Sequence, residues 1–158
     1  ARKETELKVV SSVEKKVPGF ATLFTLADDG PGVGCSEVKL SAIGRVIGKQ
    51  GAIRKRLIEC CGCELEIVGD MAYFVGTAEE RAYMTALLEV AQNGPKVYAV
   101  PAVLDPITAW VDVPDSVAGR VIGPKGSQID QLCDETGAHC SMVQQQSDAG
   151  VRKRMAIF

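Results

Sequence analysis

The sequence predicts an α+β protein made of two copies of one small domain. Two observations carry this prediction: the chain repeats itself at an offset of 75 residues, and each copy shows the same succession of short strands and helices. The composition agrees, because 46% of the 158 residues are hydrophobic and the mean hydropathy is +0.08, which is enough for a packed core.

The repeat is clearest around a motif that contains two glycines. Residues 44–51 read GRVIGKQG and residues 119–126 read GRVIGPKG, with six of the eight positions identical. The same register already holds upstream, where Val38 aligns with Val113, so the repeat covers a structural unit rather than a loop.

The repeat divides the chain into four predicted parts. The N-terminal part matches neither copy, and we assign it no role. The segment between the copies reads GPKVYAVPAVLDP, which is too apolar for a flexible tether, so we expect it to pack against the domains. The parts are an extension at 1–35, the first domain at 36–93, the connector at 94–106 and the second domain at 107–158.

The first copy predicts the order strand, helix, helix, strand, strand, helix. Alternating apolar residues indicate the strands, and Gly69-Asp70 suits a two-residue hairpin. Thr77 and Glu80 form a capping box before the last helix, which ends at Asn93-Gly94-Pro95. The expected elements are strands at 37–41, 64–68 and 71–75, short helices at 42–47 and 52–61, and a last helix between 77 and 93.

The second copy predicts the same order without the last helix. Its expected elements are a strand at 107–113, helices at 116–122 and 127–135, and strands at 140–144 and 153–158 around a loop at 145–152. A three-stranded sheet with one bare apolar face is poorly protected. We therefore expect a helix beyond residue 158 or another segment of the chain to cover it.

The glycines between the two short helices suit a phosphate ligand. The first glycine lets the chain leave a helix through a conformation that is costly for other residues, and the second lets backbone N–H groups approach a ligand. The dipole of the following helix favours an anion there. Lys49 and Lys125 lie inside these turns, and residues 45–56 carry five positive charges and no acid.

Both motifs resemble the signature of K-homology (KH) domains. The matching residues are VIGKQG at 46–51 and VIGPKG at 121–126, the latter followed by Ile129, Leu132 and Thr136-Gly137-Ala138. The resemblance covers about 110 residues. It implies two tandem type I KH domains, each a three-stranded antiparallel sheet packed on helices, the second without its C-terminal helix. A type II arrangement would leave 71–92 without a place in the first domain.

The resemblance also implies the function and its residues. KH domains bind single-stranded RNA or DNA, and their GXXG loop clamps about four nucleotides. The groove lies between the two helices with their loop and the strand that follows, with aliphatic side chains as its floor and cations at its rim. The implied RNA-binding residues are Arg45, Ile47, Gly48, Lys49, Gln50, Gly51, Arg54, Leu65 and Ile67 in the first copy, and Arg120, Ile122, Gly123, Pro124, Lys125, Gly126, Cys140 and Met142 in the second.

The copies depart from the family pattern in different ways, which leaves open which of them binds better. The first has Arg54 where the second has Ile129, and its hairpin is short. The second has Pro124 in its loop and three acids behind it, at Asp130, Asp134 and Glu135. Bases would lie on aliphatic side chains, because only 5% of the residues are aromatic.

Charge and composition exclude several function classes. With 18 basic and 20 acidic residues the net charge is −2, which excludes coating of nucleic acid by bulk positive charge. A single histidine and the absence of a catalytic grouping predict a protein that is not an enzyme and needs no cofactor. The six cysteines have no spacing typical of a metal site, so we expect reduced thiols in an intracellular protein.

Together these patterns predict a binding protein whose partner is single-stranded RNA, with single-stranded DNA left open. Post-transcriptional mRNA regulation in the cytoplasm or nucleus is the expected role, and no membrane partner is expected. Self-association and protein partners are also left open. The alternative is a KH pair that serves as a protein-interaction scaffold with weak or lost RNA binding, which the pI of about 5.5 favours.

Overall fold

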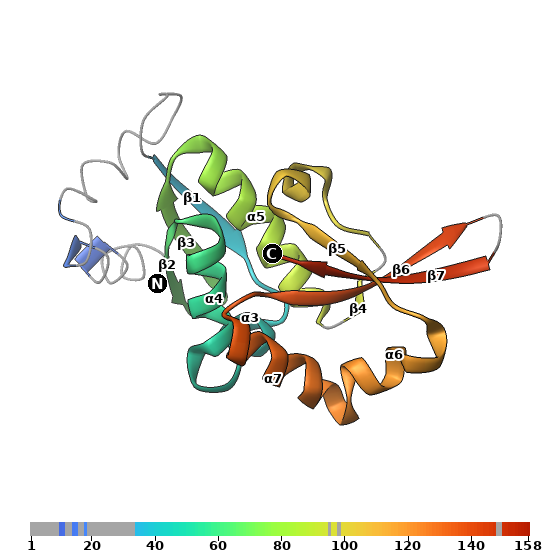
Figure 1. The fold of residues 1–158 in the computed structure, drawn as a ribbon. Coiled ribbons are helices and arrows are strands. Elements are labelled where there is room, and N and C mark those ends of the chain that lie inside the picture. Colours follow the sequence, from blue (N-terminus) through green and yellow to red (C-terminus); the bar gives the residue numbers. More distant parts are fainter. Residues whose placement is uncertain are drawn as a thin grey trace.

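The computed structural model places the two copies side by side (Figure 1). It describes residues 34–94, 96–97, 99–147 and 150–158, together with 10, 11, 14, 15 and 18. The predictions for the rest of the N-terminal extension lie outside the described residues. Of that extension, Val10 packs against the outer face of the first sheet, beside Tyr73 and Val75.

The first copy has the predicted order of elements. Its boundaries differ from the prediction by three residues at most. The elements are β1 (Gly34–Lys39), α3 (Ile43–Ile47), η1 (Lys49–Gly51), α4 (Ala52–Cys61), β2 (Glu64–Val68), β3 (Met71–Gly76) and α5 (Ala78–Asn93). The strands form an antiparallel sheet in the order β1-β3-β2.

The capping box at the start of α5 is confirmed. The backbone N–H of Thr77 donates to Oε2 of Glu80 at 2.7 Å, and the N–H of Glu80 donates to Oγ1 of Thr77 at 3.3 Å. These bonds fix the N-terminus of α5. The helix then buries a stripe of apolar residues against the first sheet, among them Met84, Leu87 and Leu88.

The second copy repeats this order up to its third strand. Its elements are β5 (Ala109–Asp112), α6 (Asp115–Ile122), η3 (Pro124–Gly126), α7 (Ser127–Thr136), β6 (Cys140–Ser147) and β7 (Gly150–Ile157). The predicted loop at 145–152 is wrong, because β6 continues to Ser147 and β7 begins at Gly150. The sequence there is polar, and pairing with the neighbouring strand extends both strands.

The connector contributes two elements that the sequence did not predict. β4 (Lys96–Val97) pairs in parallel with β6 at Met142 and Val143, so the second sheet has four strands in the order β4-β6-β7-β5. η2 (Ala102–Ile107) follows and buries Leu104 completely.

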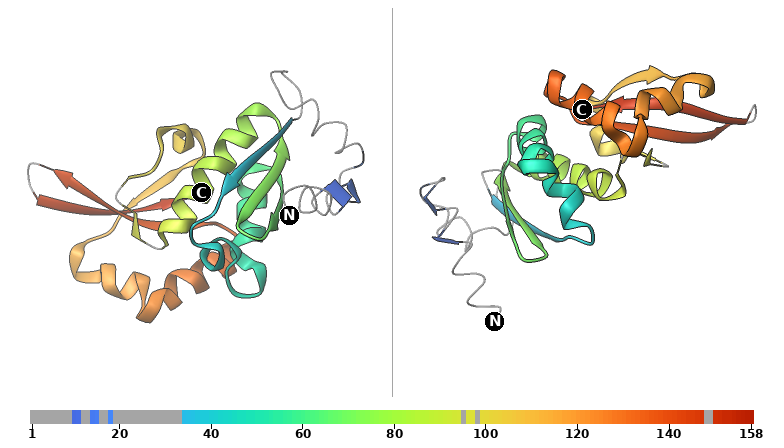
Figure 2. Two further views of the ribbon diagram at one scale, coloured as in Figure 1. Left: turned by 180° about the vertical axis from the view of Figure 1, so that it is seen from behind. Right: turned by 90° about the horizontal axis from the view of Figure 1, so that it is seen from below.

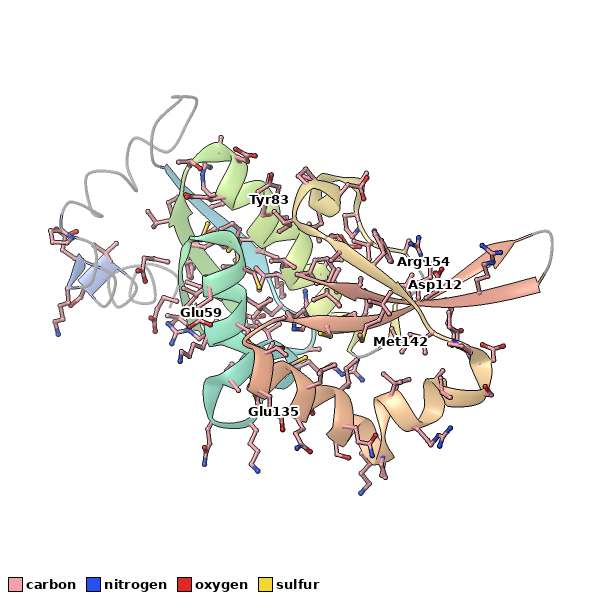
Figure 3. All side chains as sticks on the ribbon, viewed as in Figure 1. Glu59, Tyr83, Asp112, Glu135, Met142 and Arg154 are labelled. Carbon is pink, nitrogen blue, oxygen red and sulfur yellow. The ribbon has the colours of Figure 1, made fainter. Side chains whose placement is uncertain are left out.

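The two faces of the second sheet pack against different partners. Side chains alternate along a strand, so neighbouring residues point to opposite faces. Met142 and Met155 face α6 and α7, as the position of Met142 in Figure 3 shows. Val143 and Ala156 point the other way, into a core shared with α5 and Leu104. The helix α5 of the first copy and η2 thus cover one face of the second sheet (Figure 2).

Candidate nucleic-acid interface

Each GXXG turn begins with a glycine whose backbone other residues adopt only with strain. Gly48 has a φ of 71° and Gly123 a φ of 73°, both in the left-handed region. A Cβ atom at Gly48 would lie 2.6 Å from the side chain of Ile53. At Gly123 it would lie 2.7 Å from the side chain and 2.8 Å from the backbone nitrogen of Gln128. The turn therefore packs directly on the helix that follows it in both copies.

The third residue of each GXXG turn also has the same left-handed backbone conformation. Gln50 has a φ of 53° and Lys125 a φ of 54°, and the side chains of both are exposed. The turns differ at the preceding position, where the first copy has Lys49 and the second has Pro124. Proline has no N–H group, so the second turn offers one backbone donor fewer to an anion.

A shallow pocket of about 360 Å³ lies beside the first turn, between α4 and β2. Its lining residues are Gln50, Gly51, Ala52, Arg54, Lys55, Ile58 and Glu64. The guanidinium of Arg54, which lines this pocket, donates to the backbone oxygen of Leu65 and pairs with Glu66 at 2.9 Å. The side chain of Arg54 is 30% exposed and that of Lys55 is 78% exposed, so both cations of this pocket reach solvent, and Nζ of Lys55 lies 3.7 Å from Oε1 of Glu59.

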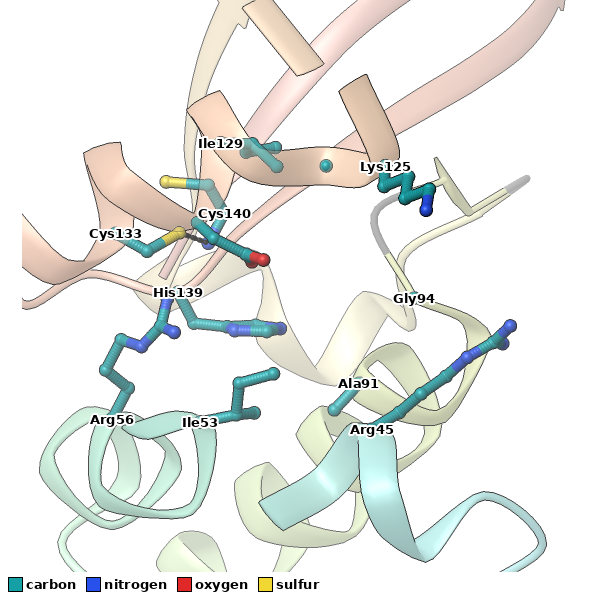
Figure 4. A pocket seen from close by; sticks show the side chains of 12 residues that line it. Arg45, Ile53, Arg56, Ala91, Gly94, Lys125, Ile129, Cys133, His139 and Cys140 are labelled. Carbon is teal, nitrogen blue, oxygen red and sulfur yellow. Dashed lines mark hydrogen bonds between the residues drawn. The ribbon is translucent and has the colours of Figure 1, made fainter. Parts of the chain in front are cut away.

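A pocket of about 310 Å³ lies beside the second turn, and both copies line it (Figure 4). The second copy contributes Lys125, Gly126, Ile129, Asp130, Cys133, His139 and Cys140, and the first contributes Arg45, Ile53, Arg56, Ala91 and Gly94. Arg56 is buried and reaches across the junction, where its Nη2 lies 3.5 Å from Oδ1 of Asp134.

The two pockets occupy the same place in the repeat. Five lining residues correspond at the offset of 75, as the pairs Gly51 and Gly126, Arg54 and Ile129, Lys55 and Asp130, Ile58 and Cys133, and Glu64 and His139. Each copy thus presents the same hollow next to its turn, although the side chains that line the two hollows differ in charge.

Comparison with known families decides what this repeated unit is. The KH domain family matches the chain twice, at residues 37–86 and 108–155, which together make up more than half of it. The chain belongs to the KH domain family. KH domains are nucleic-acid-binding domains, and the fold is generally non-enzymatic. The described elements are those of two tandem type I KH domains, and no helix follows β7 among the described residues.

Some solved structures show a low similarity to this chain. Dim2p from Pyrococcus horikoshii OT3 is 17% identical, with 77% of this chain and 80% of that chain covered and a TM-score of 0.35. A protein of unknown function from Aeropyrum pernix is 14% identical, with 78% and 73% covered and a TM-score of 0.37. A chain in the complex of a/eIF2alpha, aDim2p and rRNA from P. horikoshii is 18% identical, with 78% and 76% covered and a TM-score of 0.33. Among curated proteins, none matches the chain.

Some of the residues predicted to bind RNA in the first KH copy lie at the groove, and others are buried in the core. Ile47 and Ile67 are half-buried, whereas Leu65 is only 2% exposed and belongs to the core. Arg45 turns away from the first pocket: its Nη1 donates to the backbone oxygen of Gln92 at 2.9 Å, and its side chain lines the second pocket.

In the second KH copy the predicted groove floor is more deeply buried. Met142 is 0% exposed and Cys140 is 6% exposed, although Cys140 still lines the pocket. Ile122 is half-buried, and Arg120 is exposed but lines neither pocket. The edge of β6 at Met142 is paired with β4, so the connector takes part of the strand edge that would border this groove.

His139 is a residue of this site that sequence reasoning missed. It is 6% exposed, stacks on Phe158 at a ring distance of 6.1 Å, and neither ring nitrogen has a hydrogen-bond partner among the described residues. Burial, together with the positive charge of Arg56, lowers its pKa to about 4. The signal in the sequence was its place directly before the strand of the groove, at the position where the first copy has Glu64.

All six cysteines are free thiols, and two of them lie in the wall of the second pocket. The backbone N–H of Cys140 lies 3.3 Å from Sγ of Cys133. A hydrogen bond between the two thiols lowers the pKa of Cys133 to about 7 and raises the pKa of Cys140. Within the described part of the chain, no group of side chains suits a metal ion, and no helix has the length and apolar character to span a membrane.

Proposed function

We propose that the chain binds single-stranded RNA through its two GXXG loops and the pockets beside them. The observation that carries this proposal is the repetition of one geometry: two turns with the same backbone course, each with an exposed lysine next to a hollow. A phosphate group at the turn and a base in the hollow would use both features.

The proposed biological role is post-transcriptional regulation of mRNA in the cytoplasm or the nucleus. The protein acts by binding rather than by catalysis, and it needs no cofactor. Single-stranded DNA of the same sequence is the matched competitor, because only RNA offers a 2′-hydroxyl group to the protein.

Titration of the wild type with a random pool of short single-stranded RNA tests the proposal. The comparison proteins carry Lys49→Asp with Gln50→Asp, or Pro124→Asp with Lys125→Asp, which place negative charge in one turn at a time. We expect salt-sensitive binding by the wild type and a weaker complex for each loop variant. Equal binding by wild type and both variants, or no salt-sensitive binding below high micromolar concentration, overturns the proposal.

A scaffold that binds proteins instead of RNA is the second candidate. The observation in its favour is the exposure of two large apolar side chains, Val103 at 42% and Val111 at 44%. Val111 pairs with Met155 and therefore lies on the face of the second sheet that packs on α6 and α7. Under this candidate, substitution of Val111 by Asp abolishes partner binding, whereas the loop variants leave partner binding unchanged.

A further inference from the structure

The pocket beside the second loop is completed by the first KH copy. Of its three cations, Arg45 and Arg56 come from the first copy and only Lys125 from the second. Helix α7 of the second copy contributes an acid, Asp130, at the position where the first copy has Lys55. Without the first copy, this hollow would have one cation and one acid.

The walls of this pocket suit the flat faces of a nucleobase. Ile53 and Ala91 of the first copy line one side, and Ile129 of the second copy lines the side opposite (Figure 4). Aliphatic walls can hold a base by apolar contact with its faces, and a volume of about 310 Å³ lies at the lower end of the roughly 300–1,000 Å³ of ligand pockets.

His139 contributes to this pocket a buried imidazole ring whose nitrogens can form hydrogen bonds with a ligand. The side chain is more than nine-tenths buried, its ring projects into the pocket in Figure 4, and both ring nitrogens lack partners among the described residues. The low pKa keeps the ring neutral at pH 7, so it offers one N–H donor and one nitrogen acceptor. The edge of a base offers both kinds of group, whereas a phosphate offers only acceptors.

The cations lie where a backbone phosphate could reach them. Arg45 and Lys125 are exposed and lie on the same side of the pocket in Figure 4, with Lys125 on the turn itself. The guanidinium of Arg45 also rests against Gly94, where a Cβ atom would lie 3.7 Å from it. Arg56, by contrast, is held at the buried end by Asp134.

We infer that this pocket binds one unpaired nucleotide jointly between the two KH copies. Its base lies between Ile53 and Ile129 with its edge at His139, and its phosphate contacts Lys125 and Arg45. The inference rests on the proposed function and deepens it: Arg45 serves the second copy rather than its own, and the two copies hold one strand as a single binding unit.

A double-mutant cycle on Arg45 tests the assignment. Affinity for each of the four homopolymer RNA octanucleotides is measured for Arg45→Gln in three backgrounds: wild type, Lys49→Asp with Gln50→Asp, and Pro124→Asp with Lys125→Asp. We expect Arg45→Gln to weaken binding about tenfold in the first two backgrounds and to have no effect in the third, because the phosphate site is then already lost.

Arg120→Gln is the matched comparison, because Arg120 occupies the equivalent position of the second copy and lines neither pocket. We expect it to cost less affinity than Arg45→Gln. If the loss from Arg45→Gln disappears when the first loop is disabled and persists when the second is disabled, the inference is wrong and the proposed function stands. If the wild type shows no salt-sensitive binding, the proposed function itself fails.

The base-reading role of His139 has a direct spectroscopic readout, since it is the only histidine of the chain. Imidazole nitrogen shifts are recorded by NMR on the wild type during titration with the tightest-binding homopolymer. We expect both nitrogen signals to move on binding, and His139→Phe, which keeps the stacking on Phe158, to lose about tenfold in affinity. Unchanged imidazole signals at saturation would exclude the role, whether or not His139→Phe folds.

Discussion

The two KH copies carry equivalent pockets that obtain positive charge from different sources. Beside the first loop, Arg54 and Lys55 of the same helix supply it. Beside the second, the equivalent residues are Ile129 and Asp130, and the cations Arg45 and Arg56 come from the other copy. A domain whose own helix has no cation at these positions can still form a basic pocket when a neighbouring domain packs against it.

The packing of the two copies against each other is what forms the second pocket. The first copy is held against the second by three features. They are the covered face of the second sheet, the shared core around Leu104 and the ion pair between Arg56 and Asp134. The second pocket exists only in this arrangement. Predictions on stability can therefore test whether the copies act as one body.

The largest effect is expected for Leu104→Ala. Leu104 is 0% exposed and lies in a core cluster with residues of α5, Val143 and Ala156. Removing its side chain leaves a cavity at the junction and should cost about 2–5 kcal/mol of unfolding free energy. Urea denaturation measures the loss, and Val103→Ala is the control, because Val103 is 42% exposed and should change stability by less than about 0.5 kcal/mol. Equal losses for both variants would show that the junction is not packed.

A fall in pH should destabilise the second copy through His139. The first copy has no such group, because its equivalent residue is the exposed Glu64. The folded-state pKa of His139 is lowered from 6.5 to about 4, so below pH 6.5 the unfolded chain binds a proton that the folded chain does not. Stability therefore falls as the pH drops from 6.5 to 4, by about 3 kcal/mol. Chemical denaturation at several pH values measures this, and His139→Gln should flatten the dependence in that window. A slope that persists in the variant would assign the effect to carboxylates.

Substitution of the first glycine of each turn should destabilise the two copies to different extents, because different atoms surround the two glycines. Gly48→Ala and Gly123→Ala should each cost about 1–3 kcal/mol, since both positions have a left-handed φ. The loss should be larger at Gly123, where the new Cβ would meet a backbone nitrogen rather than a side chain alone. Thermal unfolding measures both.

The glycines that begin the two repeated motifs provide matched controls for this prediction. Gly44 lies in α3 and Gly119 in α6, and beyond the adjoining backbone of its own helix an added Cβ at either position would have no atom of the described residues within 4 Å. Their substitution by Ala should be neutral or stabilising by up to about 1 kcal/mol, because alanine favours helix. Equal destabilisation at all four positions would contradict the role given to the turns.

The smallest effect is expected for Asp134→Ala at the junction. The side chain of Asp134 is 61% exposed and lies 3.5 Å from Arg56, so water can take the place of its carboxylate and the loss of unfolding free energy should be below about 1 kcal/mol. Arg56→Met should cost more, since Arg56 is buried and packs between the copies. Denaturation curves of both variants, measured in parallel, rank the two contributions. The reverse ranking would mean that Asp134 and not Arg56 holds the junction.

The sequence by itself determined the fold of each copy and the place of its loop. The helix boundaries follow from local signals such as the capping box at Thr77 and the repeated GXXG motif, and local signals are read directly from the chain. The lengths of β6 and β7 were missed, because polar residues such as Gln145 and Arg152 continue a strand only when a neighbouring strand pairs with them.

What only the tertiary structure decided is the contact between the copies. Nothing in the pattern around Arg45 shows that its side chain lines the hollow of the other copy. Nothing around His139 shows that its ring is buried there with no hydrogen-bond partner among the described residues. Both depend on how α5 and the connector dock on the second sheet, which is set by the complementary shapes of surfaces far apart in the chain. The net charge of −2 is an average over the whole sequence and does not show where the cations lie. The docking of the two copies brings three of them together around one pocket.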